Sequence, residues 1–209
     1  MHRIDKSGNY EQETMKQKNI IQAPKGETKV LLHTCCAPCS SAIIEAMLLN
    51  GITPVIYYCN PNIYPQEEYE IRKDECTRYA QALGLEIVDA DYDHQEWLCN
   101  VAGMEDEPER GGRCLKCFKM RLLKTAEYAI QRGIKVITTT LASSRWKSLD
   151  QINEAGEWAC SQINPPDGEV IWWNQNWRKG GLQERRLQII KEYDFYNQQY
   201  CGCEFSMRT

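Results

Sequence analysis

The sequence lacks a long apolar run. No stretch reaches the roughly 18 residues that a membrane-spanning helix needs, and residues 1 to 19 are polar, without the apolar segment of a secretory signal. The chain also lacks an excess of positive charge, because its 209 residues carry a formal net charge of −4. Overall charge therefore does not indicate a nucleic-acid-binding protein. We expect a cytoplasmic protein with no membrane partner.

Histidine is scarce, with three residues, whereas cysteine is abundant, with eleven. A reducing compartment disfavours structural disulfides, so clustered thiols point to metal binding or redox chemistry. The tightest groups are CCAPC at residues 35–39 and CGC at residues 201–203, and RCLKC adds Cys114 and Cys117. Isolated cysteines usually behave as small buried side chains. We expect this of Cys59, Cys76, Cys99 and Cys160.

The sequence has no internal repeat, and 42% hydrophobic residues is ordinary for a globular protein. Apolar runs alternate with helical patterns. Strands are predicted at residues 29–34, 53–59, 85–92, 135–141 and 169–177, and helices at 40–50, 67–84, 93–103, 115–132, 148–163 and 182–197. This alternation predicts an α/β fold with a mainly parallel, doubly wound, Rossmann-like sheet. We expect a polar extension at residues 1–27 and one α/β catalytic domain at residues 28–209.

Ligands of such sheets lie beyond the carboxyl ends of the strands, and the CCAPC group follows the first strand directly. Thiolates at a strand-to-helix turn lie near the positive end of the helix. Adjacent Cys35 and Cys36 can serve one site only if the chain turns there, and Pro38 favours a turn. His33 precedes the group, where a hydrogen-bonded core role is favoured over tuning of the cysteines.

The RCLKC pair lies about 75 residues after CCAPC, farther than the roughly 15 to 20 residues that separate the pairs of structural zinc folds. We therefore expect a site assembled at the mouth of a preformed fold. Sulfur ligands suit zinc or an iron–sulfur cluster, and spacing leaves both open. A disulfide within CGC would close a small, strained and easily reduced ring. That pair is predicted to have a redox role or to supply two more metal ligands.

Two stretches are locally basic, residues 110–124 and 178–186. Each is read as a solvated face or as a phosphate-binding surface. TTTLASSRWK at residues 138–147 has hydroxyl groups and two cations at a strand end, which suit a phosphate or a ribose. Ordinary helix capping by its serines, or by Ser148, is an equally good explanation.

Several motifs occur together in a fixed order: CCAPC after the first strand, NPNIYPQEEYEIR after the second, then RCLKCFKMRL, TTTLASSRWK and a terminal YCGC. This ordered set resembles the epoxyqueuosine reductases of the QueH type, from about residue 29 to residue 206. The resemblance implies a HUP-like α/β fold and an oxidoreductase that removes the epoxide oxygen of epoxyqueuosine at the wobble position of tRNA, the last step of queuosine biosynthesis. It also implies an external electron donor.

The resemblance further implies a 4Fe-4S cluster whose ligands match Cys35, Cys36, Cys114 and Cys117. It implies a redox-active disulfide at Cys201 and Cys203. Cys39 is a candidate ligand of an additional mononuclear iron. The loops that follow the strands are expected to hold the anticodon stem-loop of the tRNA. The candidate substrate-binding residues are Asn60, Asn62, Tyr64, Tyr69, Arg72, Ser143, Lys147 and Arg178.

The chain departs from the family pattern at SSRWK, where a Ser-Pro-Tyr type sequence is expected, and at WRKGGLQERR, where Phe-Arg-Pro-Gly is usual. These departures make the substrate residues less secure than the cluster ligands. Two rival functions remain. A tRNA thiolase of the ATP-pyrophosphatase kind would need an S-G-G-x-D-S phosphate loop, which is absent after the first strand. A zinc-stabilised binding module could use the same four thiols without being an enzyme.

Overall fold

The computed structural model describes residues 20–90, 92–163 and 169–207. Its five strands are all parallel and form one sheet in the order β3-β2-β1-β4-β5. They are β1 (Lys29–His33), β2 (Thr53–Tyr58), β3 (Ile87–Asp89), β4 (Val136–Thr139) and β5 (Ile171–Trp172). The predicted α/β fold with a parallel, doubly wound sheet is therefore confirmed.

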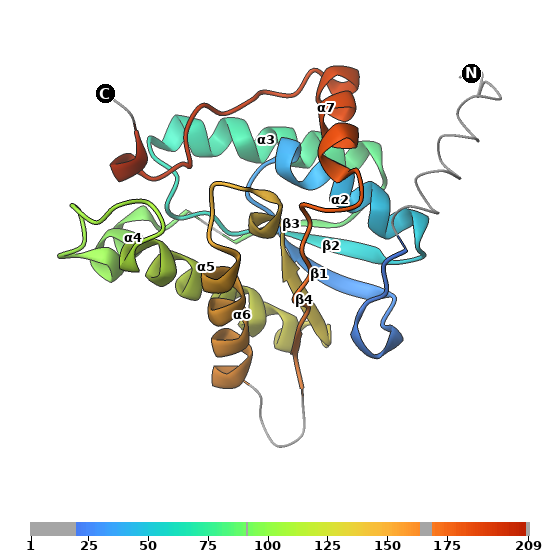
Figure 1. Ribbon diagram of the computed structural model, residues 1–209, viewed down its shortest axis with the longest axis horizontal. Helices are drawn as coiled ribbons and strands as arrows, with labels where there is room; N and C mark the ends of the chain where they lie inside the picture. Colours follow the sequence, from blue (N-terminus) through green and yellow to red (C-terminus); the bar gives the residue numbers. More distant parts are fainter. Residues whose placement is uncertain (1–19, 91, 164–168, 208–209) are drawn as a thin grey trace.

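Helices cover both faces of this sheet. They are α2 (Ala37–Leu49), α3 (Gln66–Ala82), α4 (His94–Val101), α5 (Gly112–Gln131), α6 (Leu149–Ile163) and α7 (Leu182–Tyr193). Short 3-10 segments are η1 (Pro24–Gly26), η2 (Thr140–Ser143) and η3 (Glu204–Ser206). Figure 1 shows α2, α3 and α7 on one side of the strands and α4, α5 and α6 on the other. Leu31 and Leu32 of the central strand β1 are fully buried, as expected for a strand covered on both faces.

Two helices begin three residues earlier than predicted, and both differences concern the cysteines. Helix α2 begins at Ala37 rather than at residue 40, because Pro38 fits the first turn, where its missing N–H would have had no partner. Helix α5 begins at Gly112 rather than at residue 115, and the Glu107 carboxylate accepts a hydrogen bond from the Gly112 N–H. Cys39 and Cys114 therefore lie in first turns of helices.

Strand β5 is shorter than predicted, with two residues in place of the span 169–177. Trp172 is half-buried within β5, and the two tryptophans that follow the strand are buried by packing of their side chains. Trp173 and Trp177 are 6% and 0% exposed, and their rings meet edge to face with centroids 5.2 Å apart. The aromatic content of this span therefore indicates the burial of Trp173 and Trp177 correctly but overestimates the length of β5.

The N-terminal boundary stays a prediction, because residues 1–19 lie outside the described residues. Within the described part, Ala23 is 3% exposed and packs in the core, and Lys25 forms an ion pair with Glu169. The chain therefore already contacts the domain before residue 28. Among the described residues, no helix is both long enough and apolar enough to cross a membrane.

Candidate metal and redox site

The site lies at the point where the sheet order reverses. Strand β1 is followed along the chain by its neighbour β2, whereas β4 lies on the other side of β1. The loops that leave β1 and β4 therefore diverge and open a crevice at the carboxyl ends of the strands. Cys35 follows β1 and Thr140 follows β4, and the Cys35 N–H donates to Thr140 Oγ1 at 3.3 Å. The CCAPC group thus occupies the position predicted for a ligand.

The thiols of Cys35, Cys36 and Cys39 form a compact group in which all the Sγ atoms lie within 4.8 Å of one another. Among the described residues this is the one such group of three or more potential metal ligands. The chain bends at Cys35, and Cys36, which is extended with φ −171° and ψ 157°, is the N-cap residue of α2. This bend lets adjacent cysteines face one site, as predicted. All three side chains are free thiols.

A cavity of about 420 Å³ opens beside this group. Five cysteines from separate parts of the chain line it: Cys35, Cys39, Cys114, Cys201 and Cys203. Cys117 lies one helical turn beyond Cys114 on α5 and packs, 7% exposed, in a small cluster with Trp97, Val101 and Cys203. The structure therefore brings Cys114, Cys201 and Cys203 to the same cavity as Cys35. It does not gather Cys114 and Cys117 into the compact thiol group.

The cavity is strongly cationic although the chain is not. Its lining contains six cationic side chains and one acid, Glu109. The cations are Arg72, Arg110, Arg113, Arg145, Lys147 and Arg186. Burial by itself favours the neutral amine of Lys147, but the nearby thiolate charges, led by that of Cys201, more than offset this effect and raise its pKa. A ligand in this cavity therefore meets positive charge.

Negative charge in the thiol group concentrates on Cys35. Hydrogen bonding with Cys36 and then Cys39, together with the charge of Lys147, holds the pKa of Cys35 well below its usual range. Burial raises the pKa of Cys36 well above its usual range. Arg121, 2% exposed on α5, supplies a buried positive charge nearby, with its Nε donating to Cys59 O at 3.1 Å and its Nη1 3.9 Å from Cys117 Sγ. The positive charge of Arg121 therefore offsets part of the negative charge of an anionic centre at the thiols.

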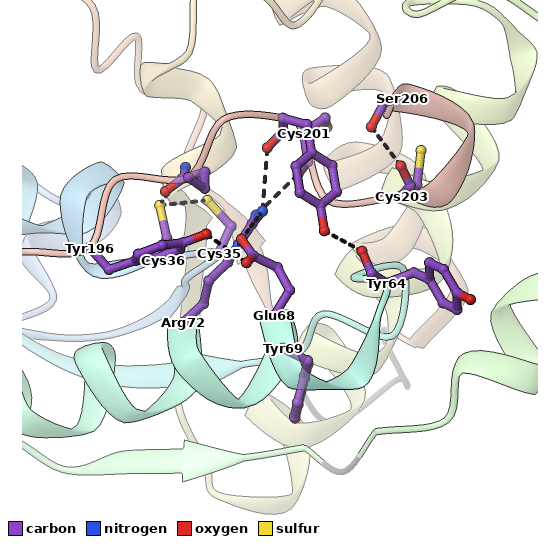
Figure 2. A network of polar contacts seen from close by, with 12 residues as sticks. Cys35, Cys36, Tyr64, Glu68, Tyr69, Arg72, Tyr196, Cys201, Cys203 and Ser206 are labelled. Atoms are coloured by element: carbon purple, nitrogen blue, oxygen red, sulfur yellow. Dashed lines mark hydrogen bonds and ion pairs between the residues drawn. The ribbon is translucent and has the colours of Figure 1, made fainter. Parts of the chain in front are cut away.

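Residues 196–207, which we call the C-terminal strap, cross the open side of the thiol group. Gln198 Nε2 donates to Cys36 Sγ at 3.1 Å and lies 3.7 Å from Cys39 Sγ. Figure 2 shows Arg72 reaching from α3 to the strap backbone, where its guanidinium donates to the carbonyl oxygens of Cys201 and Tyr200 at 3.4 Å each. The strap therefore carries the CGC pair to the cavity.

A model of the family described as "Epoxyqueuosine reductase QueH" matches residues 30–209. The chain is 49% identical over 188 residues to an epoxyqueuosine reductase QueH of Haemophilus influenzae, covering 90% of this chain and 75% of that protein. It is 48% identical to a Histophilus somni protein of the same name, and the match covers 90% of this chain and 76% of that protein. It is 45% identical to an epoxyqueuosine reductase QueH of Acinetobacter baylyi, and the match covers 90% of this chain and 84% of that protein. The chain belongs to the epoxyqueuosine reductase QueH family. The resemblance based on the motifs is thereby confirmed.

Some of the predicted substrate residues of this QueH-family chain line the cavity and others lie outside its lining. Arg72, Ser143 and Lys147 line the cavity. Asn60 is fully buried away from it, where its amide donates to Thr34 O at 2.9 Å and accepts from Arg121. The others also lie outside the lining: Asn62, Tyr64, Tyr69 and Arg178. A substrate contact of any of them stays a prediction.

Some of these outer residues support the site. Arg178 donates to Lys147 O at 2.7 Å, and Tyr64 accepts at its carbonyl from the Tyr200 hydroxyl and donates its N–H to Gly202 O at 2.8 Å. Ser148 Oγ accepts from Gln151 N at 3.3 Å, the pattern of a helix cap. These contacts position the loops around the cavity of the QueH-family chain.

His33 is a fully buried, hydrogen-bonded core residue, as predicted. Its Nε2–H donates to Cys59 O at 3.0 Å, and its Nδ1 accepts from Thr139 Oγ1 at 2.7 Å. Burial, assisted by the charge of Arg121, lowers the pKa of His33 to about 3, so the ring is neutral. The isolated cysteines are buried as expected except Cys99, which is exposed on α4.

Sequence reasoning missed three residues of the QueH-family site: Arg121, Gln198 and Glu68. Arg121 follows Cys117 by four residues, so it shares a helix face with a predicted ligand, and that spacing was an available signal. Glu68 and Arg72 are likewise four residues apart and form a buried ion pair at 2.7 Å. Nothing local in the sequence indicates that Gln198 returns to Cys36.

Proposed function

We propose that this chain reduces epoxyqueuosine to queuosine at the wobble position of tRNA. Family membership makes the chain an oxidoreductase, an epoxyqueuosine reductase. The observation that supports the fuller proposal is one cavity in which CCAPC, Cys114 and the CGC pair meet under a cationic lining. A cytoplasmic location follows from the tRNA substrate.

The charge of the cavity supports an RNA substrate. Most contacts in protein–nucleic acid complexes go to phosphate and sugar, and a splayed loop can be held by few charges. Six cations against one acid, in a chain of net charge −4, concentrate positive charge where the cysteines lie. An anticodon stem-loop could therefore present its wobble base to the thiols while its phosphates contact the arginines.

The donor set fits a metal cofactor, since it consists of free thiols from several parts of the chain. We propose that Cys35, Cys36, Cys114 and Cys117 hold a 4Fe-4S cluster and that Cys39 is available to an additional iron. Such a cofactor would supply electrons and a Lewis-acid iron to the epoxide. The positive charge of Arg121 and the first-turn N–H groups of α2 favour the negative charge of an iron–thiolate centre at this place.

The reaction consumes two electrons and two protons: both C–O bonds of the epoxide break, a C=C bond forms, and the oxygen leaves as water. A dithiol that closes to a disulfide releases two electrons and two protons, so the CGC pair matches this requirement. Cys201 is exposed and Cys203 is 8% exposed, and burial raises the pKa of Cys203 to about 11. Cys201 is thus the better placed of the two to meet an external reductant. Lys147 holds a proton at the cavity wall.

Metal analysis distinguishes the proposed enzyme from a zinc-stabilised module. Protein purified without oxygen is expected to be brown and to contain iron and acid-labile sulfide. Incubation with an epoxyqueuosine-containing stem-loop RNA and reductant should then remove one oxygen atom from the modified nucleoside. A colourless, zinc-loaded protein that leaves the nucleoside unchanged would contradict the proposal. Sulfur uptake by the RNA would indicate the thiolase instead.

Replacing Cys201 or Cys203 with serine tests the role of the CGC pair. Either change should lower turnover with a cellular thiol or protein reductant, because the electron relay is interrupted while binding remains, and should leave iron content unchanged. Cys160→Ser, a buried cysteine outside the cavity, serves as the control. Unchanged turnover of both CGC variants, with the cellular and with a chemical reductant, would remove the relay role.

A further inference from the structure

The loop at residues 144–148 carries an indole into the mouth of the cavity. Trp146 is 66% exposed and lines the cavity, whereas Trp97 and Trp177 are fully buried. An exposed aromatic side chain of this size leaves a large apolar area in contact with water, and burial of that area against a partner is favourable. The side chain is therefore available to a ligand of the same cavity that holds the cysteines.

Arginines fix the backbone of this loop and leave the indole free. Arg110 donates from Nε to Trp146 O and from Nη2 to Arg145 O, both at 2.9 Å. Arg178 donates to Lys147 O at 2.7 Å, and Ser144 Oγ accepts from Trp146 N at 3.3 Å. A loop backbone held in this way loses little conformational freedom when the side chain on it binds a ligand.

Positive charge surrounds the indole. The guanidinium of Arg145 lies 6.0 Å from the centroid of the Trp146 ring, and Arg110 and Lys147 line the same cavity. An aromatic face beside cations is the arrangement with which proteins hold unpaired nucleotides, because the ring stacks on a base while the cations contact phosphates. An apolar protein partner would gain nothing from these charges.

We propose that Trp146 is a stacking platform for an unpaired base next to the modified base in the RNA loop. This inference rests on the proposed function, since it assumes that the loop of an anticodon stem-loop enters the cavity. It assigns recognition to SSRWK, where the chain departs from the family pattern. Trp146 then contributes to binding of the RNA, while the thiols act on the epoxide.

Binding is measured with the metal-loaded protein, without oxygen, using a fluorescently labelled anticodon stem-loop with guanosine at the wobble position. Trp146→Ala should raise Kd by about five- to 140-fold, the range for loss of one stacked base. Trp146→Phe should retain most of the affinity and Trp146→Leu should not, because stacking needs an aromatic ring.

The salt dependence of Kd should be unchanged in Trp146→Ala, whereas Arg145→Gln should reduce its slope by about one. Leu187→Ala, which removes a 57% exposed side chain outside the cavity lining, is the matched control.

Abasic substitutions in the RNA identify the stacked base. At one loop position the abasic RNA should lose affinity for the wild-type protein and show no further loss with Trp146→Ala, because the two changes remove the same contact. With epoxyqueuosine RNA, Trp146→Ala should raise KM and leave kcat within about twofold. Equal RNA affinity of wild type and Trp146→Ala, or wild-type affinity in Trp146→Leu, would overturn the inference. A change in oligomeric state instead of a change in RNA affinity would overturn it too. A wild-type protein that binds this RNA without deoxygenating epoxyqueuosine would contradict the proposed function while leaving the stacking result intact.

Discussion

Replacing Cys35 with serine is expected to remove the iron and to lower turnover by more than about a hundredfold. Changing a residue behind a metal ligand already costs about 10- to 100-fold in metal affinity or activity, and Cys35 belongs both to the compact thiol group and to the proposed ligand set. Its low pKa makes it the thiol of this group most ready to ligate. The measurement is iron and sulfide per chain, with turnover of epoxyqueuosine RNA measured in parallel.

Cys99→Ser is the matched control for this change, because Cys99 is exposed on α4 and does not line the cavity. It should retain full iron content and activity. Two further variants test the ligand set. Under the proposal, Cys117→Ser loses the cluster and Cys39→Ser retains it. The reverse result would assign the cluster to the compact group of Cys35, Cys36 and Cys39 and would contradict the proposed set.

Replacing Arg72 with alanine is expected to destabilise the protein by about 3–5 kcal/mol, the usual cost of leaving a buried charge unpaired. Arg72 is 2% exposed and its Nε donates to Glu68 at 2.8 Å, so the variant would leave the buried Glu68 carboxylate without a positive partner, although the Tyr196 hydroxyl still donates to it at 2.7 Å. The melting midpoint should fall by about 10 °C for a chain of this size. Loss of the two contacts to the strap should also expose Cys203. Calorimetry and the rate of Cys203 alkylation measure the two effects.

A double change separates these effects. Glu68→Gln combined with Arg72→Met removes both charges, so much of the lost stability should return. The strap should remain detached, and the fast alkylation of Cys203 should persist. Arg78→Ala on the same helix breaks an exposed ion pair with Glu75 and should shift the midpoint by only a few degrees. Slow alkylation of Cys203 in Arg72→Ala would show that Arg72 does not hold the strap.

The sequence was sufficient to predict the parallel sheet and the place of CCAPC in it. Strand periodicity and helix length are local properties, and the rule that ligands lie at carboxyl ends of strands then locates the cysteines. The bend before α2 was predictable for the same reason, since Pro38 acts on its neighbours. Helices α2 and α5 begin earlier than predicted because Pro38 and Gly112 lie in their first turns, where proline and glycine are tolerated.

The C-terminal strap was not predictable, because its contacts join residues far apart in sequence. Gln198 reaches Cys36 across 162 positions, and Arg72 reaches Tyr200 across 128. Polar type alone also does not indicate which loop residues are accessible. Asn60 is fully buried and hydrogen-bonded within the fold, and its contact with substrate stays a prediction. Burial of this kind depends on tertiary packing, which no local pattern encodes.

The mass of the modified nucleoside tests the central claim most directly. Wild-type protein and Cys35→Ser are incubated with epoxyqueuosine-containing stem-loop RNA and the same reductant, and the RNA is digested to nucleosides. The proposal predicts that the wild-type sample loses one oxygen atom from epoxyqueuosine and that the Cys35→Ser sample does not. Retention of the oxygen by iron-loaded wild-type protein, or equal loss with Cys35→Ser, would contradict it.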